Sequence, residues 1–313
     1  MGPIVIVGRL PKDAGIGGVT VHVDRLSKWL ARTGISVQIC DYKLMPIYAQ
    51  IKLLRYSLIV HIHASHPIFR FLYVIISRIL RKKSILTIHG NIGRFGFIKN
   101  SLDKLSIKLC DIPIVINEGS YIQAIKWNKK TRLVSAYLPP LSEGYLPDFV
   151  RQRIERARDE DKKIICTNAS ARSFTPDGNE IYGIDFLISY FKGNPSYYLC
   201  VSDPSSQYSD FYNNRSYDNI LFITEPHSFY ALMKCADVSI RATATDGDSL
   251  SVREGLDIGI TVIATDCVSR PEGTILFKYN DAQTLTKALT TSASVRSVSN
   301  NNVIEELVEI YNS

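Results

Sequence analysis

Acidic, basic and hydroxyl side chains crowd the segment 241–255, which runs Arg-Ala-Thr-Ala-Thr-Asp-Gly-Asp-Ser-Leu-Ser-Val-Arg-Glu-Gly. The pattern predicts a strand end, a turn at Gly247 and the start of a helix. Unpaired amides at a helix start can bind a pyrophosphate, and a carboxylate further along, such as Glu254, can accept hydrogen bonds from both hydroxyls of a ribose. We therefore predict a nucleotide site here. The alternative is a capping loop, in which Ser249 or Ser251 caps the helix.

Two other segments carry groups that could contact a sugar or a phosphate. The loop 11–20 places Gly15, Gly17 and Gly18 between an expected strand and an expected helix, where backbone amides can approach a phosphate. Its spacing does not fit the dinucleotide fingerprint, and a plain strand-to-helix turn is the alternative. His89 follows a buried strand and can donate a hydrogen bond to a sugar hydroxyl or a leaving phosphate.

A metal site is not expected among the histidines that precede this segment. His61, His63 and His66 lie around the end of an expected strand. His61 and His63 would share one face of that strand, without a carboxylate nearby to complete a ligand set.

Alternating strands and helices must position these residues. Strands are expected at 4–7, 37–40, 58–61, 84–88 and 112–116, and again at 163–167, 197–201, 219–223, 238–241 and 261–265. Residues with helical spacing, as at 19–33, lie between them. This alternation predicts parallel sheets covered by helices on both faces, an α/β class.

A break near residue 140 indicates two domains. A chain of 313 residues suits two domains of roughly 150 residues each, and Pro139, Pro140 and Gly144 interrupt the alternation. We predict an N-terminal domain at 1–145 and a C-terminal domain at 146–302, with a helix at 303–313 that packs back on the first. Ligands of such folds bind at the carboxyl ends of the strands, here in a cleft between the domains.

Charge is distributed unevenly between the two halves. Residues 1–150 contain 21 Lys and Arg against 8 Asp and Glu, whereas the remainder contains 16 against 22. The first half is therefore expected to face something anionic: a membrane surface, a phosphate-bearing substrate or nucleic acid. The six cysteines are dispersed, which favours neither disulfides nor a zinc site and suits a reducing cytoplasm.

The order of these segments resembles that of family 4 of the retaining glycosyltransferases. Asp246 and Glu254, eight residues apart, resemble its acidic-x7-acidic motif. Three other similar segments are Val60-His-Ile-His63, Thr87-Ile-His-Gly90 and Gly259-Ile-Thr-Val-Ile-Ala-Thr-Asp266, and Gly17-Gly18 resembles the family's N-terminal glycine loop. The resemblance covers nearly the whole chain and implies the GT-B fold, two doubly wound Rossmann-like domains facing a central cleft.

This chain departs from the family at the basic pair that neutralises the donor diphosphate. Arg172 can stand for the family's arginine, but Tyr182 replaces its lysine. We expect Arg253, Arg241 or Arg270 to supply the missing charge, because a lost contact of this kind would cost about 2–4 kcal/mol of leaving-group stabilisation.

Two smaller departures concern the acidic motif itself. Asp246 is shorter than the family's glutamate, and Gly255 stands where alanine is common. Asp246 and Asp248 also spell Asp-x-Asp, the metal motif of the other glycosyltransferase fold. That fold is a single domain with the motif in mid-chain, whereas here the motif follows a second set of strands and helices. We therefore expect no metal ion and no cofactor.

The resemblance implies a retaining hexosyltransferase. It would move a sugar from a nucleotide-sugar donor to a glycan or a polyprenyl-diphosphate-linked acceptor, in polysaccharide biosynthesis of the O-antigen or capsule kind. The resemblance implies catalytic roles for Arg172, which would stabilise the departing diphosphate, and for His89 and Asp246, which would orient the donor sugar. The residues expected to bind the donor are Gly17, Gly18, Asp248, Ser249, Leu250, Ser251, Arg253 and Glu254. A sugar-nucleotide epimerase of the same fold is an alternative.

A basic, apolar segment suggests an anionic membrane surface as a further partner. Residues 66–83 form an apolar helix that ends in a basic cluster, and Lys126, Lys129, Lys130 and Arg132 add another. Such a helix could lie on a bilayer; the alternative is a helix that covers the sheet. We expect a cytoplasmic protein, peripheral on the inner face of the cell membrane. A basic nucleic-acid-binding protein is the non-enzymatic alternative, but known motifs are missing, so no nucleic acid is expected as a partner.

Overall fold

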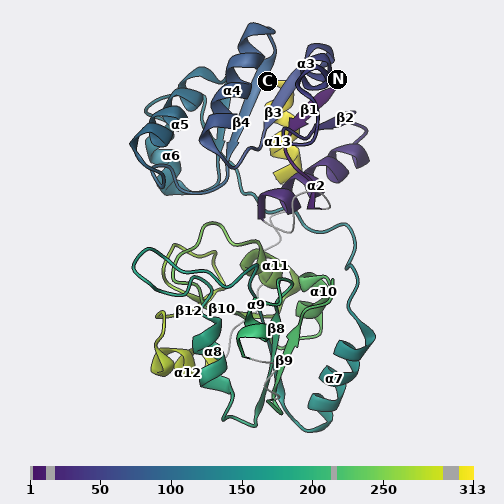
Figure 1. Ribbon diagram of the computed structural model, residues 1–313, viewed down its shortest axis with the longest axis vertical. Helices are drawn as coiled ribbons and strands as arrows, with labels where there is room; N and C mark the ends of the chain where they lie inside the picture. Colours follow the sequence, from purple (N-terminus) through teal and green to yellow (C-terminus); the bar gives the residue numbers. More distant parts are fainter. Residues whose placement is uncertain (1–2, 12–17, 213–216, 292–302) are drawn as a thin grey trace. The chain divides into compact units, whose positions relative to one another are not determined.

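The computed structural model describes residues 3–11, 18–212, 217–291 and 303–313. The chain forms two compact units: unit 1 comprises Met1–Leu141 and Asn300–Ser313, and unit 2 comprises Ser142–Ser299. Each unit has its own sheet with helices around it (Figure 1). Within the described ranges, no helix is long and apolar enough to cross a membrane.

Unit 1 is built on six parallel strands in the order β2-β1-β3-β4-β5-β6. Most of their side chains are buried, as expected for a parallel sheet that is covered on both faces. The strands are β1 (Ile4–Val7), β2 (Val37–Cys40), β3 (Ile59–Ile62), β4 (Lys83–Ile88), β5 (Ile112–Val115) and β6 (Arg132–Leu133). The first five lie within one residue of their predicted ranges, whereas the two-residue β6 was not predicted.

Helices cover both faces of this sheet. One apolar cluster joins it to α3, α4, α5 and α6, and another joins its opposite face to α2 and α13. The helices are α2 (Gly18–Arg32), α3 (Ile47–Tyr56), α4 (Pro67–Ile79), α5 (Phe97–Leu109), α6 (Glu118–Ala124) and α13 (Val303–Asn312). Unit 1 is therefore doubly wound, and α4 is one of the helices that cover the sheet.

The last helix, α13, belongs to the core of unit 1. Leu307, Ile310 and Tyr311 are buried beside α2 and β1. The Tyr311 hydroxyl lies 2.7 Å from His61 Nδ1, and Lys83 Nζ donates to the Ile310 carbonyl at 2.8 Å. A segment more than 150 residues beyond Leu141 thus completes the unit that the first strand begins.

Unit 2 has a second six-stranded parallel sheet, in the order β12-β11-β10-β7-β8-β9. The strands are β7 (Lys163–Asn168), β8 (Tyr197–Ser202), β9 (Ile220–Ile223), β10 (Val238–Arg241), β11 (Thr261–Thr265) and β12 (Ile275–Phe277). The helices are α7 (Asp148–Asp159), α8 (Ile184–Phe191), α9 (Gln207–Phe211), α10 (Phe229–Lys234), α11 (Leu250–Ile258) and α12 (Ala282–Thr290). The short β12 was not predicted.

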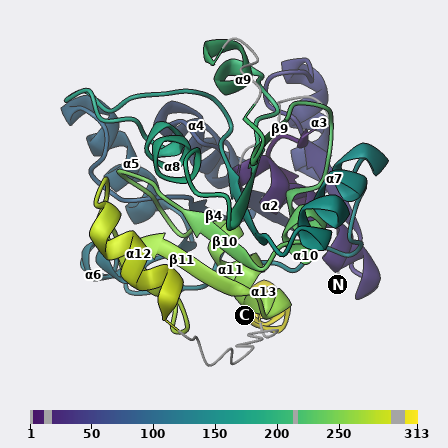
Figure 2. The ribbon, with the colours of Figure 1, turned by 90° about the horizontal axis from the view of Figure 1, so that it is seen from below.

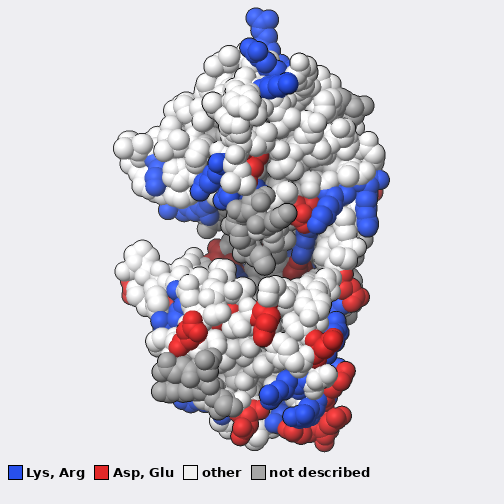
Figure 3. All heavy atoms as spheres, turned by 45° about the vertical axis from the view of Figure 1, so that its right-hand side comes forward, with Lys and Arg blue, Asp and Glu red and all other residues white. Residues whose placement is uncertain are grey.

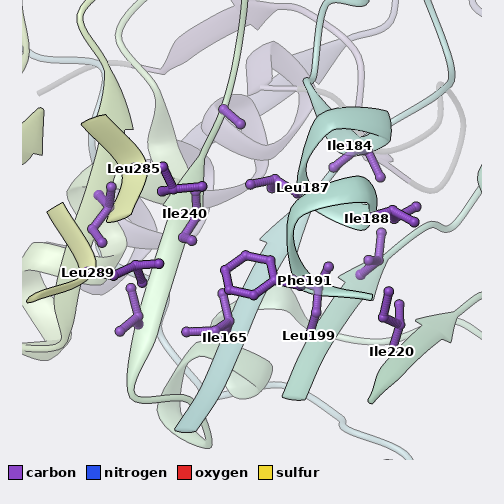
Figure 4. Packing of buried hydrophobic residues seen from close by; sticks show 14 of the residues in the cluster. Ile165, Ile184, Leu187, Ile188, Phe191, Leu199, Ile220, Ile240, Leu285 and Leu289 are labelled. Carbon is purple, nitrogen blue, oxygen red and sulfur yellow. The ribbon is translucent and has the colours of Figure 1, made fainter. Parts of the chain in front are cut away.

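The core of unit 2 is also split by its sheet. Helices α8 and α12 pack on one face and α7 and α10 on the other, as Figure 2 shows. On the first face, Phe191 of α8 lies among Ile165, Leu199 and Ile240 from three neighbouring strands (Figure 4). These contacts hold the ends of β7, β8 and β10 side by side.

A buried ion pair fixes the loop that follows β3. Arg70 on α4 and Asp103 on α5 are 0% and 1% exposed, and Arg70 Nη1 donates to both carboxylate oxygens at 2.9 Å. Arg70 also donates to the carbonyls of Ala64 and Ser65 at 2.8 and 3.0 Å. One guanidinium group therefore ties two helices to this loop.

Removing one partner of this pair should destabilise unit 1 strongly. We expect Asp103→Ala to lower the free energy of unfolding by about 3–5 kcal/mol, because Arg70 is left as an unpaired buried charge. Urea denaturation followed by tryptophan fluorescence reports on unit 1, since both tryptophans, Trp29 and Trp127, lie there. Asp24→Ala, which removes an exposed pair with Lys28, should cost less than about 1 kcal/mol; equal losses would contradict the role given to Arg70.

Candidate functional site

The carboxyl edge of the unit 2 sheet gathers polar side chains from three adjacent strands. β7 ends at Asn168, β10 at Arg241 and β11 at Thr265, and β10 lies between the other two. The predicted segment leaves β10 at this edge and enters α11 at Leu250. Parallel pairing thus brings the predicted site residues of unit 2 to one end of the sheet.

Asp246 lies between two arginines. Its carboxylate accepts hydrogen bonds from Arg241 Nε and Nη2 at 3.1 and 3.2 Å, and from Arg270 Nη1 at 2.8 Å. The Thr243 hydroxyl is 3.3 Å away. Burial favours the neutral acid, but the two guanidinium groups outweigh it and lower the pKa of Asp246 to about 2. The group is therefore a carboxylate at neutral pH, and both its oxygens are engaged by the protein.

Arg241 also lies against the tyrosine that replaces the family's lysine. Its guanidinium carbon is 5.3 Å from the centre of the Tyr182 ring, and its Nη1 reaches Asn168 Oδ1 at 3.4 Å. The Tyr182 hydroxyl is 2.5 Å from Ser170 Oγ. The positive charge of Arg241 thus stands beside position 182.

Gly183 permits this contact between the loop and β10. Its φ is +65°, and an added Cβ would lie 2.1 Å from the Ala242 carbonyl oxygen. Only glycine fits both the backbone conformation and the space. Gly255 on α11 is similarly close-packed, since an added Cβ would lie 2.6 Å from Val262 on β11. An alanine at position 255, which the resemblance would lead one to expect, would therefore crowd Val262.

Arg172 is held on the same edge by a carboxylate and an aromatic ring. Its Nη2 donates to Asp185 at 2.8 Å, and its guanidinium carbon lies 3.6 Å from the centre of the Phe211 ring. Its Nε is buried and has no hydrogen-bond partner among the described residues. Arg172 is thus held in place by Asp185 and Phe211.

The start of α11 presents hydroxyl groups. Ser249 occupies the N-cap position without capping the helix through its side chain, and its hydroxyl lies 3.0 Å from that of Ser251. The Ser249 side chain therefore does not cap α11, although this was the alternative role expected from the sequence. Arg253 donates to Asp248 at 2.5 Å, and Glu254 is 5% exposed.

In unit 1, a pocket opens at the carboxyl edge of the sheet. It has a volume of about 280 Å³ and is bordered by residues that follow three strands or begin α2, namely Arg9, Thr20, Tyr42, Lys43, His63 and Ser65. Gly18 is the exposed first residue of α2, whereas Gly17 lies outside the described residues. The pocket is a concavity lined by apolar and polar side chains, as small-ligand sites are.

Beside this pocket, His89 belongs to a cluster of buried histidines. His89 Nε2 lies 2.8 Å from His63 Nδ1, and His22 Nδ1 donates to the Ala136 carbonyl at 2.7 Å. The rings of His22, His63 and His89 are 4.9–5.1 Å apart. Of the described residues, these three could offer ring nitrogens close enough for a metal ion.

The histidines considered from the sequence are used differently. His61 contacts Tyr311 and Thr87 through its two nitrogens, and His66 accepts a hydrogen bond from the Ile68 amide at the start of α4. His22 was not predicted to join this cluster. It lies on α2, 41 positions before His63, and helical spacing predicts only that this face of α2 is partly buried. Predicting its contact with His63 would have required knowing that β1 lies beside β3 in the sheet.

Comparisons with known proteins agree on the fold. No protein-family model matches the chain, and a search of curated proteins gives no match. One similar solved structure is Anabaena HepE in complex with UDP and glucose, with a TM-score of 0.72, 12% identity and 100% of both chains covered. Another is Thermosynechococcus elongatus sucrose-phosphate synthase, with a TM-score of 0.67, 16% identity, and 100% of this chain and 98% of that chain covered. A third is WaaG, a glycosyltransferase involved in lipopolysaccharide biosynthesis, with a TM-score of 0.63, 12% identity, and 98% of this chain and 99% of that chain covered. The predicted GT-B fold with two Rossmann-like domains is confirmed.

The buried histidines should make unit 1 sensitive to acid. Burial lowers the pKa of His22 from 6.5 to about 4 and holds those of His63 and His89 well below 6.5. Protons therefore bind the unfolded chain first, and stability falls as the pH drops from 6.5 towards 4, by something on the order of 3 kcal/mol for His22 alone. Urea denaturation by tryptophan fluorescence across this range should show a shallower loss for His22→Asn; parallel curves would contradict the assignment.

Proposed function

We propose that this chain transfers a sugar from a nucleotide-sugar donor, held by unit 2, to an acceptor bound by unit 1. The main support is the group of arginines at the carboxyl edge of the unit 2 sheet, beside the start of α11. Arg241 and Arg270 share one carboxylate, Asp246, so the trio keeps a net positive charge near the start of α11. A donor diphosphate has the complementary charge.

The donor diphosphate would be bound by α11 and Arg241. The amides at the start of α11 and the hydroxyls of Ser249 and Ser251 can donate to phosphate oxygens. Arg241 would supply the charge that a lysine at position 182 would otherwise give, because its guanidinium group lies against the Tyr182 ring. Arg253 is paired with Asp248, whereas Arg241 shares its carboxylate, Asp246, with Arg270.

We propose a role for Asp246 that differs from the one expected from the sequence. It was expected to orient the donor sugar, but its oxygens already accept hydrogen bonds from Arg241 and Arg270. We propose that Asp246 holds these arginines in place for the leaving diphosphate. Glu254, on the buried side of α11, would bind the ribose hydroxyls.

The reaction would be a retaining, metal-independent transfer without a protein nucleophile. The bond between the anomeric carbon and the diphosphate breaks, a bond from the acceptor oxygen forms on the same face, and the acceptor proton passes to a diphosphate oxygen. Arg172 and Arg241 would stabilise the leaving group. Both aspartates of the Asp-x-Asp pattern are paired with arginines, which favours chemistry without a metal ion.

The acceptor would bind at the carboxyl edge of unit 1. The pocket beside His63 and the neutral imidazole of His89 can exchange hydrogen bonds with sugar hydroxyls. HepE in its complex with UDP and glucose, and WaaG in lipopolysaccharide biosynthesis, make UDP a suitable first donor probe and a lipid-linked glycan of surface polysaccharide a suitable first acceptor class.

Glu254→Gln should abolish recognition of the ribose hydroxyls. If Glu254 binds both, wild type should bind UDP more tightly than 2′-deoxy-UDP, and the variant should bind the two alike. The loss of a charge-assisted hydrogen bond corresponds to an affinity for UDP that is about 10- to 100-fold weaker, measured by calorimetry or by the thermal shift that the ligand induces. Glu155→Gln on α7 is the matched control, and a variant that still discriminates the two nucleotides would refute the role.

Arg241→Met should weaken the binding of UDP more than that of UMP. Arg241 is proposed to contact the phosphate that only the diphosphate has, so we expect its replacement to cost about 10- to 100-fold in affinity for UDP. Arg241→Lys, which keeps the charge, should recover part of this loss. Arg158→Met removes an arginine paired with Asp237 at the opposite edge of the sheet and should change neither affinity. Equal losses for UDP and UMP would place Arg241 away from the diphosphate.

A further inference from the structure

Three histidines from separate parts of the chain meet at the carboxyl edge of the unit 1 sheet. His63 and His89 directly follow the neighbouring strands β3 and β4, and His22 lies on α2, between β1 and β2. All three side chains are buried. One ring nitrogen of each lies within 4.8 Å of those of the other two. We call these three residues the histidine cluster.

His22 is oriented in the way that metal-binding histidines are. Its Nδ1 donates to the Ala136 carbonyl at 2.7 Å. In the neutral ring this hydrogen bond places the proton on Nδ1 and leaves a lone pair on Nε2. An outer hydrogen bond of this kind fixes the tautomer and the orientation of a histidine ligand.

His63 has a buried ring nitrogen that the described residues leave unpaired. Its Nδ1 lies 2.8 Å from His89 Nε2, so one of these rings donates to the other. Its Nε2 is buried and has no hydrogen-bond partner among the described residues, although most buried polar atoms in proteins have one. When His63 donates to His89, this Nε2 carries a lone pair, which a metal ion can accept.

A fourth histidine supports the cluster without belonging to it. The ring of His61 lies 4.0 Å from that of His63, measured between ring centres. Both nitrogens of His61 are already engaged, one by the Tyr311 hydroxyl and the other by the Thr87 hydroxyl. His61 therefore holds the His63 ring in place and offers no nitrogen to a metal ion.

The nature of the ligands selects the class of ion. Imidazole nitrogens suit Zn²⁺, Co²⁺, Ni²⁺ and Cu²⁺, whereas Mg²⁺ and Ca²⁺ prefer oxygen. A tetrahedral zinc ion, with bonds of about 2.0–2.1 Å to nitrogen, needs ligand atoms about 3.4 Å apart. The histidine cluster reaches this spacing with side-chain shifts of roughly 1 Å, and three histidines leave the fourth position to water.

Positive charge around the cluster limits its affinity for a dication. Arg25 acts electrostatically on His22, and Arg94 acts on His89. On the face of unit 1 in Figure 3, Lys and Arg side chains outnumber Asp and Glu. Such surroundings repel a cation, so we expect an ion that exchanges with the solvent.

We propose that His22, His63 and His89 form a reversible binding site for a transition-metal ion of the zinc class. No metal was expected at His63 from the sequence, because no carboxylate lies nearby. The fold supplies His22 and His89 as ligands instead. The proposal is tested without donor or acceptor, so it stands or falls separately from the proposed sugar transfer.

Titration of the untagged, EDTA-treated full chain with Co²⁺ tests this site, since Co²⁺ accepts the same nitrogen ligands and its visible absorption reports the coordination number. Wild type should bind one ion per chain with the intense bands of four-coordinate cobalt, and Zn²⁺ should displace it. His22→Asn and His89→Asn should each weaken binding by more than about 100-fold, because loss of an outer partner alone costs roughly 10- to 100-fold. The control is His227→Asn in unit 2, which should bind as wild type does.

Nitrogen-15 NMR of histidine-labelled wild type gives a measurement that does not depend on whether the variants fold. Zn²⁺ should move the ring-nitrogen signals of three of the six histidines strongly and leave those of His66 and His227 in place. The assignment is wrong if wild type binds no stoichiometric ion or if His22→Asn binds as tightly as wild type. Sulfur-to-metal charge-transfer absorption would also overturn it, because the ion would then sit on cysteines.

Discussion

The parallel pairing of every strand in the two sheets is the constraint from which the rest follows. A parallel strand can be reached only by a crossover, so a helix returns the chain to the starting edge each time. The loops that follow the strands therefore gather at one edge, and the residues that precede the strands gather at the other. In unit 1 the first edge carries the histidines and the small pocket, and the second carries a larger hollow lined by basic residues.

Charge at the carboxyl edge of unit 2 is arranged around shared carboxylates. Arg172 pairs with Asp185 and Arg253 with Asp248, and Asp246 pairs with two arginines, Arg241 and Arg270. Burying a guanidinium group is costly unless a carboxylate is close. Sharing Asp246 keeps both Arg241 and Arg270 in place while leaving one positive charge uncompensated. This positive charge contrasts with the net negative charge of residues 151–313.

The sequence was sufficient for the architecture because hydrophobic periodicity is strong in buried parallel strands. Ten strands were located closely; β6 and β12 were missed, since two or three residues carry no periodicity.

The segment that begins α11 was found through its polar residues. Its ion pairs were not, because Arg270 is 24 positions from Asp246 and only the β10–β11 pairing brings them together. Tyr182 looked like a missing charge in the sequence, whereas in the structure Arg241 stands beside it. The roles of individual residues in binding and catalysis stay predictions.

The discontinuous chain path of unit 1 affects how the protein can be made. Residues 303–313 are translated after unit 2, yet Leu307, Ile310 and Tyr311 lie in the apolar cluster that also includes α2. Domains generally fold during synthesis in the order in which they emerge, and here the nascent unit 1 lacks one wall until unit 2 has left the ribosome. The apolar side chains under α13, among them Leu26 and Leu30, must stay uncovered through that interval. A nascent chain of this design would expose apolar side chains of α2 to chaperones, and truncation shortly before α13 would leave them without that cover.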